Sequence, residues 1–374
     1  MTQSPGVLLT VLAFLGVIGP LVFLHELGHY LAGRLFGVKA EVFAIGFGRE
    51  LFGLTDRRGT RWTFGWLPLG GYVRFAGDLN AGSEPDPAWL ALPAEERAQT
   101  FQAKPLWQRA IIVAAGPVAN FIVAVMILAA FAMLVGVNRT PPVAGTVQPG
   151  SAAASAGIRA GDRIHTVDGR AVDDFGDIAE YVIARPAVPI RFEVERDGRM
   201  RTITAIPAVQ YKADRFGNRY AFGRMGITSP TPVVERVSLV EAPGVAVDQT
   251  LGIMRTMVDG IGQIITGLRP VSELGGPLRI AQFSGEAASA GLTSLAYLIA
   301  LISINLGFIN LLPVPMLDGG HLLFYGIEAL RRKPVGAEVQ QWAYRSGLVL
   351  LLSLMLFVTF NDLAAFGLWR GWRG

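Results

Sequence analysis

The sequence predicts a polytopic α-helical membrane protein that carries a β-rich loop and a soluble β-rich domain beside its helices. Four long apolar stretches are each long enough to cross a bilayer. Of the 374 residues, 51% are hydrophobic and only 17% are charged. Residues 41–75 and 141–207 instead show short apolar segments separated by glycine and turn residues. Four transmembrane helices and two β-rich segments are therefore expected in one chain.

The composition excludes several classes of protein. A soluble globular chain carries about 25% charged residues, and a disordered chain is polar and rich in charge. The chain has no cysteine, which excludes a disulfide scaffold, a thiolate zinc site and cysteine catalysis. The net charge is only +4 and no long basic run is present, so we expect no nucleic-acid partner.

The apolar stretches cover residues 7–24, 110–137, 293–317 and 347–369. A run of about 18 or more apolar residues is typical of a transmembrane helix. Buried helices of a large soluble protein are the alternative, which four such runs in one chain disfavour. The first run lacks the basic leader of a signal peptide and ends in His25-Glu26, so we expect a retained helix over residues 7–35.

Basic residues near the helix ends predict the orientation of the chain. Residues 34–109 hold ten lysines and arginines, the short link between helices three and four holds four more, and the N-terminal leader holds none. Arg370 and Arg373 in the tail point weakly the other way. We therefore expect both loops in the cytoplasm, and both termini and residues 138–292 on the periplasmic side of a bacterial inner membrane.

A metal-binding motif lies at the inner end of the first helix. His25 and His29 are four residues apart and share one helical face, so both imidazoles can reach one metal ion. Glu26 lies beside that face, where it can take a proton from water, as in the HExxH zinc hydrolases. An accidental match is the alternative, but ionisable groups at a membrane helix are costly and usually functional.

A catalytic zinc needs a third protein ligand, and the end of the third apolar stretch offers one. The segment from Asn310 to His321 contains two prolines that break the helix, followed by Asp318. Helices one and three run in the same direction, because one hairpin separates them, so the two motifs lie at similar depth. Asp318 is the candidate ligand and His321 a competing ligand or a partner of the ligands, whereas a plain turn at 318–320 is the alternative.

Together these motifs resemble the site-2 protease family of intramembrane zinc metalloproteases, and most closely its bacterial regulator-of-sigma-E protease (RseP) group. The resemblance rests on His25-Glu-Leu-Gly-His29 in the first helix and Asn310-Leu-Leu-Pro-Val-Pro-Met-Leu-Asp-Gly319 after the third. It extends to Gly116-Pro-Val-Ala-Asn120, Gly70-Gly-Tyr-Val73 and Gly276-Pro277.

The resemblance implies a Zn²⁺ ion held by His25, His29 and Asp318, with Glu26 activating water. It also implies residues that handle substrate near the site, which we assign to Asn310, Pro313, Pro315, Gly70 and Gly71. The implied reaction is cleavage inside the transmembrane segment of a single-span protein. An anti-sigma-factor-type substrate that has first been cut outside the membrane is expected.

The two β-rich segments have separate interpretations. Residues 41–75 read as strands with breaks at Asp56–Gly59 and Pro68–Gly71, and they resemble the family's membrane-associated β-loop. This β-loop either pairs with an unwound substrate or is a simple cytosolic hairpin. Residues 150–169 resemble the helix, turn and strand of a PDZ domain, with Arg196-Asp197-Gly198 as a later hairpin turn and residues 223–227 as the groove-forming segment.

The expected domains are therefore a membrane core in residues 1–137 and 293–374, one PDZ domain in 138–230, and a linker in 231–292. The PDZ domain either filters for trimmed substrate ends or binds peptides with no gating role. His165 is expected on its surface. An amphipathic helix over 245–268 lies on the membrane surface or packs on the protein. Asp362 faces the bundle interior or marks the end of the fourth helix.

Two other functions remain open from the sequence. A non-catalytic membrane receptor with a PDZ domain would use zinc as a structural ion, and a metal transporter would use the same ligands as a transit site. Glu26 favours the enzyme, because neither of the others needs a base that is not a ligand. Three ligands with one open position also suit a catalytic zinc better than a structural one.

Overall fold

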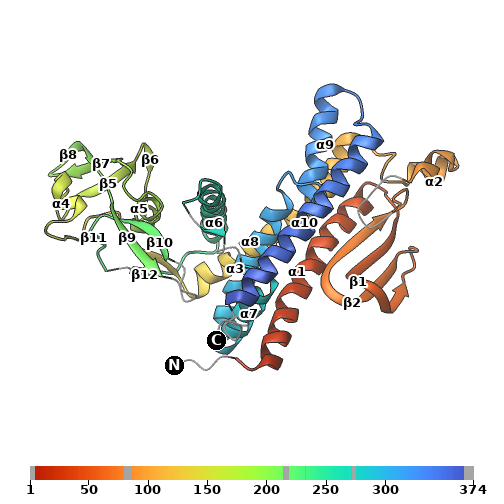
Figure 1. The fold of residues 1–374 in the computed structure, drawn as a ribbon, viewed down its shortest axis with the longest axis horizontal. Helices are drawn as coiled ribbons and strands as arrows, with labels where there is room; N and C mark the ends of the chain where they lie inside the picture. Colours follow the sequence, from red (N-terminus) through yellow and green to blue (C-terminus); the bar gives the residue numbers. More distant parts are fainter. Residues whose placement is uncertain are drawn as a thin grey trace, which may run out of the picture. The chain divides into compact units, whose positions relative to one another are not determined.

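The structure is a computed structural model that describes residues 5–79, 86–213, 219–231, 233–268, 270–271 and 275–365. The chain divides into two compact units. The first comprises Met1–Leu128, Gln249–Met254 and Gly275–Gly374, and the second Ala129–Asp248 and Arg255–Leu274. The first is mainly helical and the second mainly β (Figure 1).

Four helices in the described part of the chain are long and apolar enough to cross a membrane. They are α1 (Val7–Leu35), α3 (Leu106–Leu134), α8 (Leu292–Asn310) and α10 (Ala337–Ala365). Many of their apolar side chains are exposed in the protein alone, among them Leu8 at 73%, Met126 at 59% and Leu356 at 62%. Helices whose exposed surface is apolar in this way are suited to contact with lipid.

Two of these helices differ in their ends from the sequence-based expectation. Helix α8 ends at Asn310 and not at 317, because Pro313 cannot continue a helix and disfavours helical backbone just before it. Helix α10 begins at Ala337, ten residues before the expected start at Gly347. Its first turns are polar, so hydropathy does not mark them. Residues 366–369 of the expected fourth helix lie outside the described residues.

Two shorter helices complete the helical unit. Helix α7 (Pro277–Ala290) packs against α1, α8 and α10, and α9 (Asp318–Arg331) follows the proline segment. Asp362 of α10 is fully buried and accepts hydrogen bonds from the N–H groups of Gly276 and Arg279 at the start of α7. Its carboxylate also pairs with the Arg279 side chain at 3.2 Å. Asp362 therefore faces the interior, where it caps a helix that the sequence analysis missed.

A long β-hairpin follows α1 and consists of β1 (Ala40–Thr55) and β2 (Arg61–Phe75). The turn at Asp56–Gly59 is confirmed, and the Asp56 carboxylate accepts hydrogen bonds from the N–H groups of Arg58 and Thr60. The break expected at Pro68–Gly71 is confirmed by the pairing, although β2 is extended throughout. Residues 42–45 pair with 61–64 in the parallel sense on one side and with 71–74 in the antiparallel sense on the other. The chain therefore reverses direction between residues 64 and 71.

Aromatic packing fixes this hairpin against the helices. Phe43 is fully buried and stacks on Trp62 with 4.3 Å between ring centroids. The same cluster contains Tyr30 of α1, Phe75 of β2 and Ile112 of α3. A 3₁₀ turn, η1 (Pro87–Ala91), and α2 (Ala94–Ala98) connect the hairpin to α3. The hairpin is therefore held beside the part of α1 that carries the HExxH motif.

The second unit contains a four-stranded sheet of order β6-β5-β7-β8 and several two-stranded pairs. Its elements are β3 (Val137–Arg139), β4 (Thr146–Val147), α4 (Ala152–Ala156), β5 (Arg163–Val167), β6 (Arg170–Ala171), α5 (Phe175–Ile183), β7 (Ile190–Arg196), β8 (Arg199–Ala205), β9 (Ala208–Ala213), β10 (Arg219–Arg224), β11 (Ile227–Thr228) and β12 (Val233–Glu235). The expected helix, strand and Asp197-Gly198 hairpin are all present. Ile164, Ile190 and Phe192 are fully buried in its core.

The expected amphipathic helix is α6 (Ala242–Ile265). Its apolar stripe is open, with Val247 at 42%, Val258 at 55% and Ile265 at 79% exposed. Both expected positions, on a membrane surface or packed on the protein, would cover such a stripe and remain predictions. His165 is also on the surface, where its Nε2 lies 2.8 Å from the Glu195 carboxylate.

Candidate functional site

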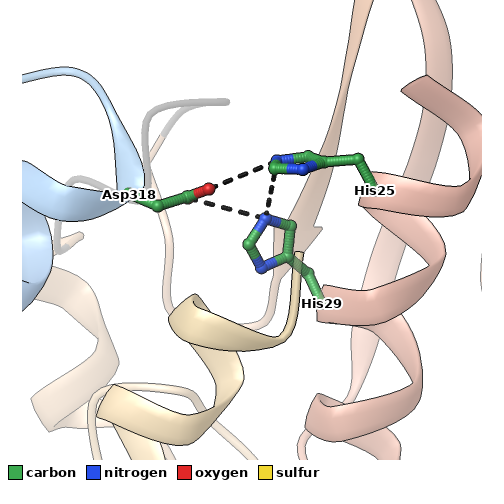
Figure 2. A group of neighbouring side chains, drawn as sticks. All are labelled: His25, His29 and Asp318. Carbon is green, nitrogen blue, oxygen red and sulfur yellow. Dashed lines mark hydrogen bonds and ion pairs between the residues drawn. The ribbon is translucent and has the colours of Figure 1, made fainter. Parts of the chain in front are cut away.

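Three side chains from distant parts of the chain converge in the helical unit (Figure 2). His25 and His29 project from α1, and Asp318 is the first residue of α9. The Nε2 atoms of the two histidines are 3.3 Å apart. Asp318 Oδ2 lies 3.2 Å from His25 Nε2, and Oδ1 lies 3.5 Å from His29 Nε2. The expected ligand set is thus brought together, with the helix start at Asp318 in place of a plain turn.

The geometry fits a zinc ion. Zinc bonds of about 2.0–2.1 Å in a tetrahedral site place the ligand atoms about 3.3–3.4 Å apart. The two ring nitrogens, 3.3 Å apart, have this spacing, and one carboxylate oxygen of Asp318 lies within 4.8 Å of both. Asp318 Oδ2 is also buried without a hydrogen-bond donor in the described part of the chain. Two ring nitrogens and a carboxylate that crowd together in this way are stabilised by a cation.

Helix α3 supports both imidazoles from one stripe of residues spaced four apart. The carbonyl of Ile112 lies 2.9 Å from His29 Nδ1, which can donate to it and leave Nε2 free for a metal. Gly116 faces the same ring, because a Cβ atom there would lie 2.2 Å from His29 Nε2. Asn120 is fully buried, and its side chain lies 3.0 Å from His25 Nδ1. The motif at residues 116–120 therefore belongs to the site.

The β-hairpin positions Glu26. This residue is only 8% exposed, and its carboxylate lies near the N–H of Val73 in β2. Gly71 lies directly against it, since a Cβ atom at Gly71 would be 2.9 Å from Glu26 Cγ and 2.7 Å from the Ala44 carbonyl oxygen. The backbone of β2 therefore contacts Glu26 directly.

A cavity of about 290 Å³ opens beside these residues. Its lining includes the three metal-ligand candidates, Glu26, residues 70–73, Asn310 and His321. Pro313 and Pro315 do not line it. Instead, the carbonyl of Pro315 faces α10, where a Cβ atom at Gly347 would lie 2.5 Å from it. Asn310, Gly70 and Gly71 therefore line the cavity, as substrate-binding residues must. The substrate-binding roles assigned to Pro313 and Pro315 remain predictions, since neither residue lines it.

His321 lies in the cavity wall, one helical turn after Asp318. Its Nδ1 is 3.1 Å from the hydroxyl of Tyr344 on α10. Among the described residues, the group that could hold a metal comprises His25, His29 and Asp318, without His321. The competing-ligand interpretation therefore has no geometric support, and His321 is a neighbour of the ligands.

The β-rich unit has a second cavity, of about 310 Å³. Apolar side chains of α5 form one wall, among them Ile178 and Val182. Residues 222–228, which contain the segment expected to form a groove, form the opposite wall. This cavity is open and mostly apolar, and an extended peptide could occupy it.

Comparison with known proteins places the chain in a family. Residues 13–354 match peptidase family M50. The chain belongs to this family. It is 44% identical over 360 residues to "Putative zinc metalloprotease Atu1380" of Agrobacterium fabrum, covering 95% of this chain and 96% of that one. It is 39% identical to "Metalloprotease MmpA" of Caulobacter vibrioides, covering 98% of each chain.

Membership of family M50 confirms the resemblance to the site-2 proteases. Together with the four apolar helices, it indicates an integral protein of the inner membrane and a zinc metalloprotease. One solved structure, the PDZ domain of an SdrC-like protein from Listeria monocytogenes, is 19% identical and covers 25% of this chain and 90% of its own. Its TM-score is 0.18, which is too low to support an argument.

The contacts that α3 and β2 make with the site were not predicted from the sequence. Asn120 could have been found, because a polar side chain inside an apolar span is costly and needs a partner. The contact of Val73 with Glu26 could not have been found in this way, because the Val73 side chain takes no part in it and every residue except proline has a backbone N–H group.

Proposed function

We propose that the protein is a zinc-dependent endopeptidase that cleaves the transmembrane segments of single-span membrane proteins. The observation that carries this proposal is that His25, His29 and Asp318 lie close enough to hold one metal ion, with Glu26 beside them on a helix apolar enough to span a membrane. Structural zinc sites have four protein ligands, whereas catalytic sites have three and an open position.

Each residue has a role in the proposed reaction. Zinc bound by His25, His29 and Asp318 would lower the pKa of water and polarise the scissile carbonyl. Glu26, oriented by the Val73 N–H, takes the proton of the attacking water and passes it to the leaving amine. The cavity holds the substrate backbone next to Glu26. Because helical carbonyls are bonded internally, the substrate must unwind locally before attack.

The hairpin offers an unwound substrate a place to bind. Residues 71–75 pair with residues 40–45 on one side, and residues 70–73 line the cavity. An extended substrate can add to such a strand through backbone hydrogen bonds, while Asn310 contacts it from the opposite wall. We therefore assign substrate binding to Gly70, Gly71 and Asn310.

The β-rich unit is proposed to be a PDZ-like domain that binds a peptide or the trimmed end of a substrate. Support comes from the apolar cavity between α5 and residues 222–228. In this proposal, the domain and both termini are periplasmic and the zinc site lies toward the cytoplasmic side, as the basic residues predict. The substrate is of the anti-sigma-factor type, cut first outside the membrane by another protease.

The test compares wild-type protein, Glu26→Gln and the exposed control Glu95→Gln on a tagged single-span substrate in liposomes, with zinc measured on the same samples. We expect Glu26→Gln to keep zinc and lose cleavage, and Glu95→Gln to behave as wild type. Cleavage by Glu26→Gln at the wild-type rate would contradict the mechanism. Wild-type protein that binds zinc but cuts neither intact nor trimmed substrate would favour a receptor or a transporter.

A further inference from the structure

The side chain of Asn120 on α3 reaches an imidazole of the metal site. It is completely buried, and its Nδ2 lies 3.0 Å from His25 Nδ1. In this orientation its Oδ1 is buried without a hydrogen-bond donor among the described residues. The main-chain oxygen of Asn120 has its own partner, because it accepts a hydrogen bond of 2.7 Å from Ser303 Oγ on α8.

The atom of the Asn120 amide that faces His25 depends on whether His25 Nδ1 carries a proton. A neutral histidine that binds a metal through Nε2 carries its proton on Nδ1, so Nδ1 is a hydrogen-bond donor. An amide nitrogen is also a donor, and the two groups would repel each other. Oxygen and nitrogen of an asparagine amide exchange places by a half-turn of the side chain. The half-turn brings Oδ1 to His25 and gives this buried oxygen a donor.

We propose that Asn120 is a positioning residue whose amide oxygen accepts a hydrogen bond from His25 Nδ1 and thereby holds Nε2 toward the zinc. Ile112 performs the same task for His29 through its main-chain carbonyl, at 2.9 Å. The two acceptors are two helical turns apart on α3, and the two histidines are one turn apart on α1. Helix α3 thus fixes the tautomer and the ring orientation of both imidazoles.

The proposal rests on the zinc site of the proposed function but not on cleavage of any substrate. Its prediction concerns metal affinity, because groups that hydrogen-bond to metal-binding histidines typically contribute about 10–100-fold to that affinity. A residue that merely fills space would be replaced without loss by an apolar side chain of the same size. An acceptor would be replaced without loss only by another acceptor.

The experiment measures zinc affinity by chelator competition on the full-length protein in detergent. Asn120→Leu keeps the volume and removes the acceptor, and we expect it to weaken zinc binding about 10–100-fold. Asn120→Asp keeps an acceptor and removes the NH₂ group, and we expect affinity equal to wild type or tighter. Ser303→Ala, which removes only the hydrogen bond to the main chain of Asn120, is the matched control and should leave affinity unchanged.

Cobalt-substituted samples give a second readout, since the visible spectrum reports the coordination of the metal. We expect the spectrum of Asn120→Asp to match wild type and that of Asn120→Leu to change. Wild-type affinity in Asn120→Leu, or equal weakening in Asn120→Asp and Asn120→Leu, would overturn the proposal. If Asn120→Leu does not fold, the affinity of Asn120→Asp still decides. Wild-type protein that binds no zinc would overturn the proposed function as well.

Discussion

The contact between Gly116 and His29 allows a test that separates the metal site from the fold. Gly116→Ala adds one methyl group, whose carbon would lie 2.2 Å from His29 Nε2. An ordinary contact between such atoms is about 3.5 Å, so the ring must move by about 1.3 Å. Metal–ligand distances tolerate only about ±0.2 Å. The displaced nitrogen therefore leaves the position from which it can bind zinc.

The fold should tolerate this change. Alanine is a better helix former than glycine by about 1 kcal/mol, and the obstructing atom is the end of a side chain that can rotate away. We expect normal helix content and normal membrane insertion. Removing a hydrogen bond that supports a metal ligand lowers affinity by up to about 100-fold. Zinc affinity should fall by at least this much in Gly116→Ala, because the ligand itself is displaced.

The assay is chelator competition for zinc, with circular dichroism on the same samples. Gly19→Ala in α1 is the matched control, since a Cβ atom at Gly19 would have nothing within 4 Å. It should bind zinc as wild type does. Gly116→Ala with wild-type zinc affinity would refute the assignment of His29 Nε2 as a ligand, and with it the packing of α3 against the site.

Three further predictions follow from other contacts. Gly71→Ala should keep zinc but lower cleavage at least tenfold, because the new methyl group would displace Glu26; normal cleavage would contradict the role of β2. His321→Gln should keep zinc at wild-type affinity, and its loss would show that this histidine is a ligand. Burial alone would raise the pKa of Asp162. Hydrogen bonds from Arg196 outweigh this effect, so the pKa of Asp162 is lowered. The Asp162–Arg196 pair is bidentate, at 2.6 Å for both bonds, so Asp162→Asn should destabilise the β-rich unit by about 1.5–3 kcal/mol at neutral pH. A carboxyl with a lowered folded-state pKa stabilises the fold above its unfolded pKa of about 3.9, and this stabilisation is lost as the pH falls further. Denaturation would be measured over a series of pH values. Equal acid sensitivity in Asp162→Asn and wild type would contradict the role of this carboxyl.

Much of the site could be predicted because its metal-binding residues occur in short sequence motifs. The i, i+4 spacing of His25 and His29 places them on one face of a helix, whatever surrounds that helix. Asp318 could be joined to them because the topology of membrane helices fixes direction and depth. Apolar runs also predicted the four long helices, since the bilayer imposes their length.

What could not be predicted depends on packing between segments that are distant in sequence. Helix α7 is short and only partly apolar, and its start is stabilised by Asp362, which lies 86 residues away from Gly276. The start of α10 is polar and gives no hydropathy signal. Residues 61–64 and 71–74 pair with opposite sides of residues 42–45. Local propensity predicts the turn between these two segments but not the strand that they flank.

The place of the cut in the substrate tests the central claim most directly. Wild-type protein in liposomes would be given a single-span substrate, and the products would be measured by intact mass spectrometry, with Glu26→Gln as the background. The account predicts one or a few adjacent cuts inside the apolar span, absent from the Glu26→Gln sample. Cuts confined to the soluble flanks, or cuts that persist in Glu26→Gln, would contradict it.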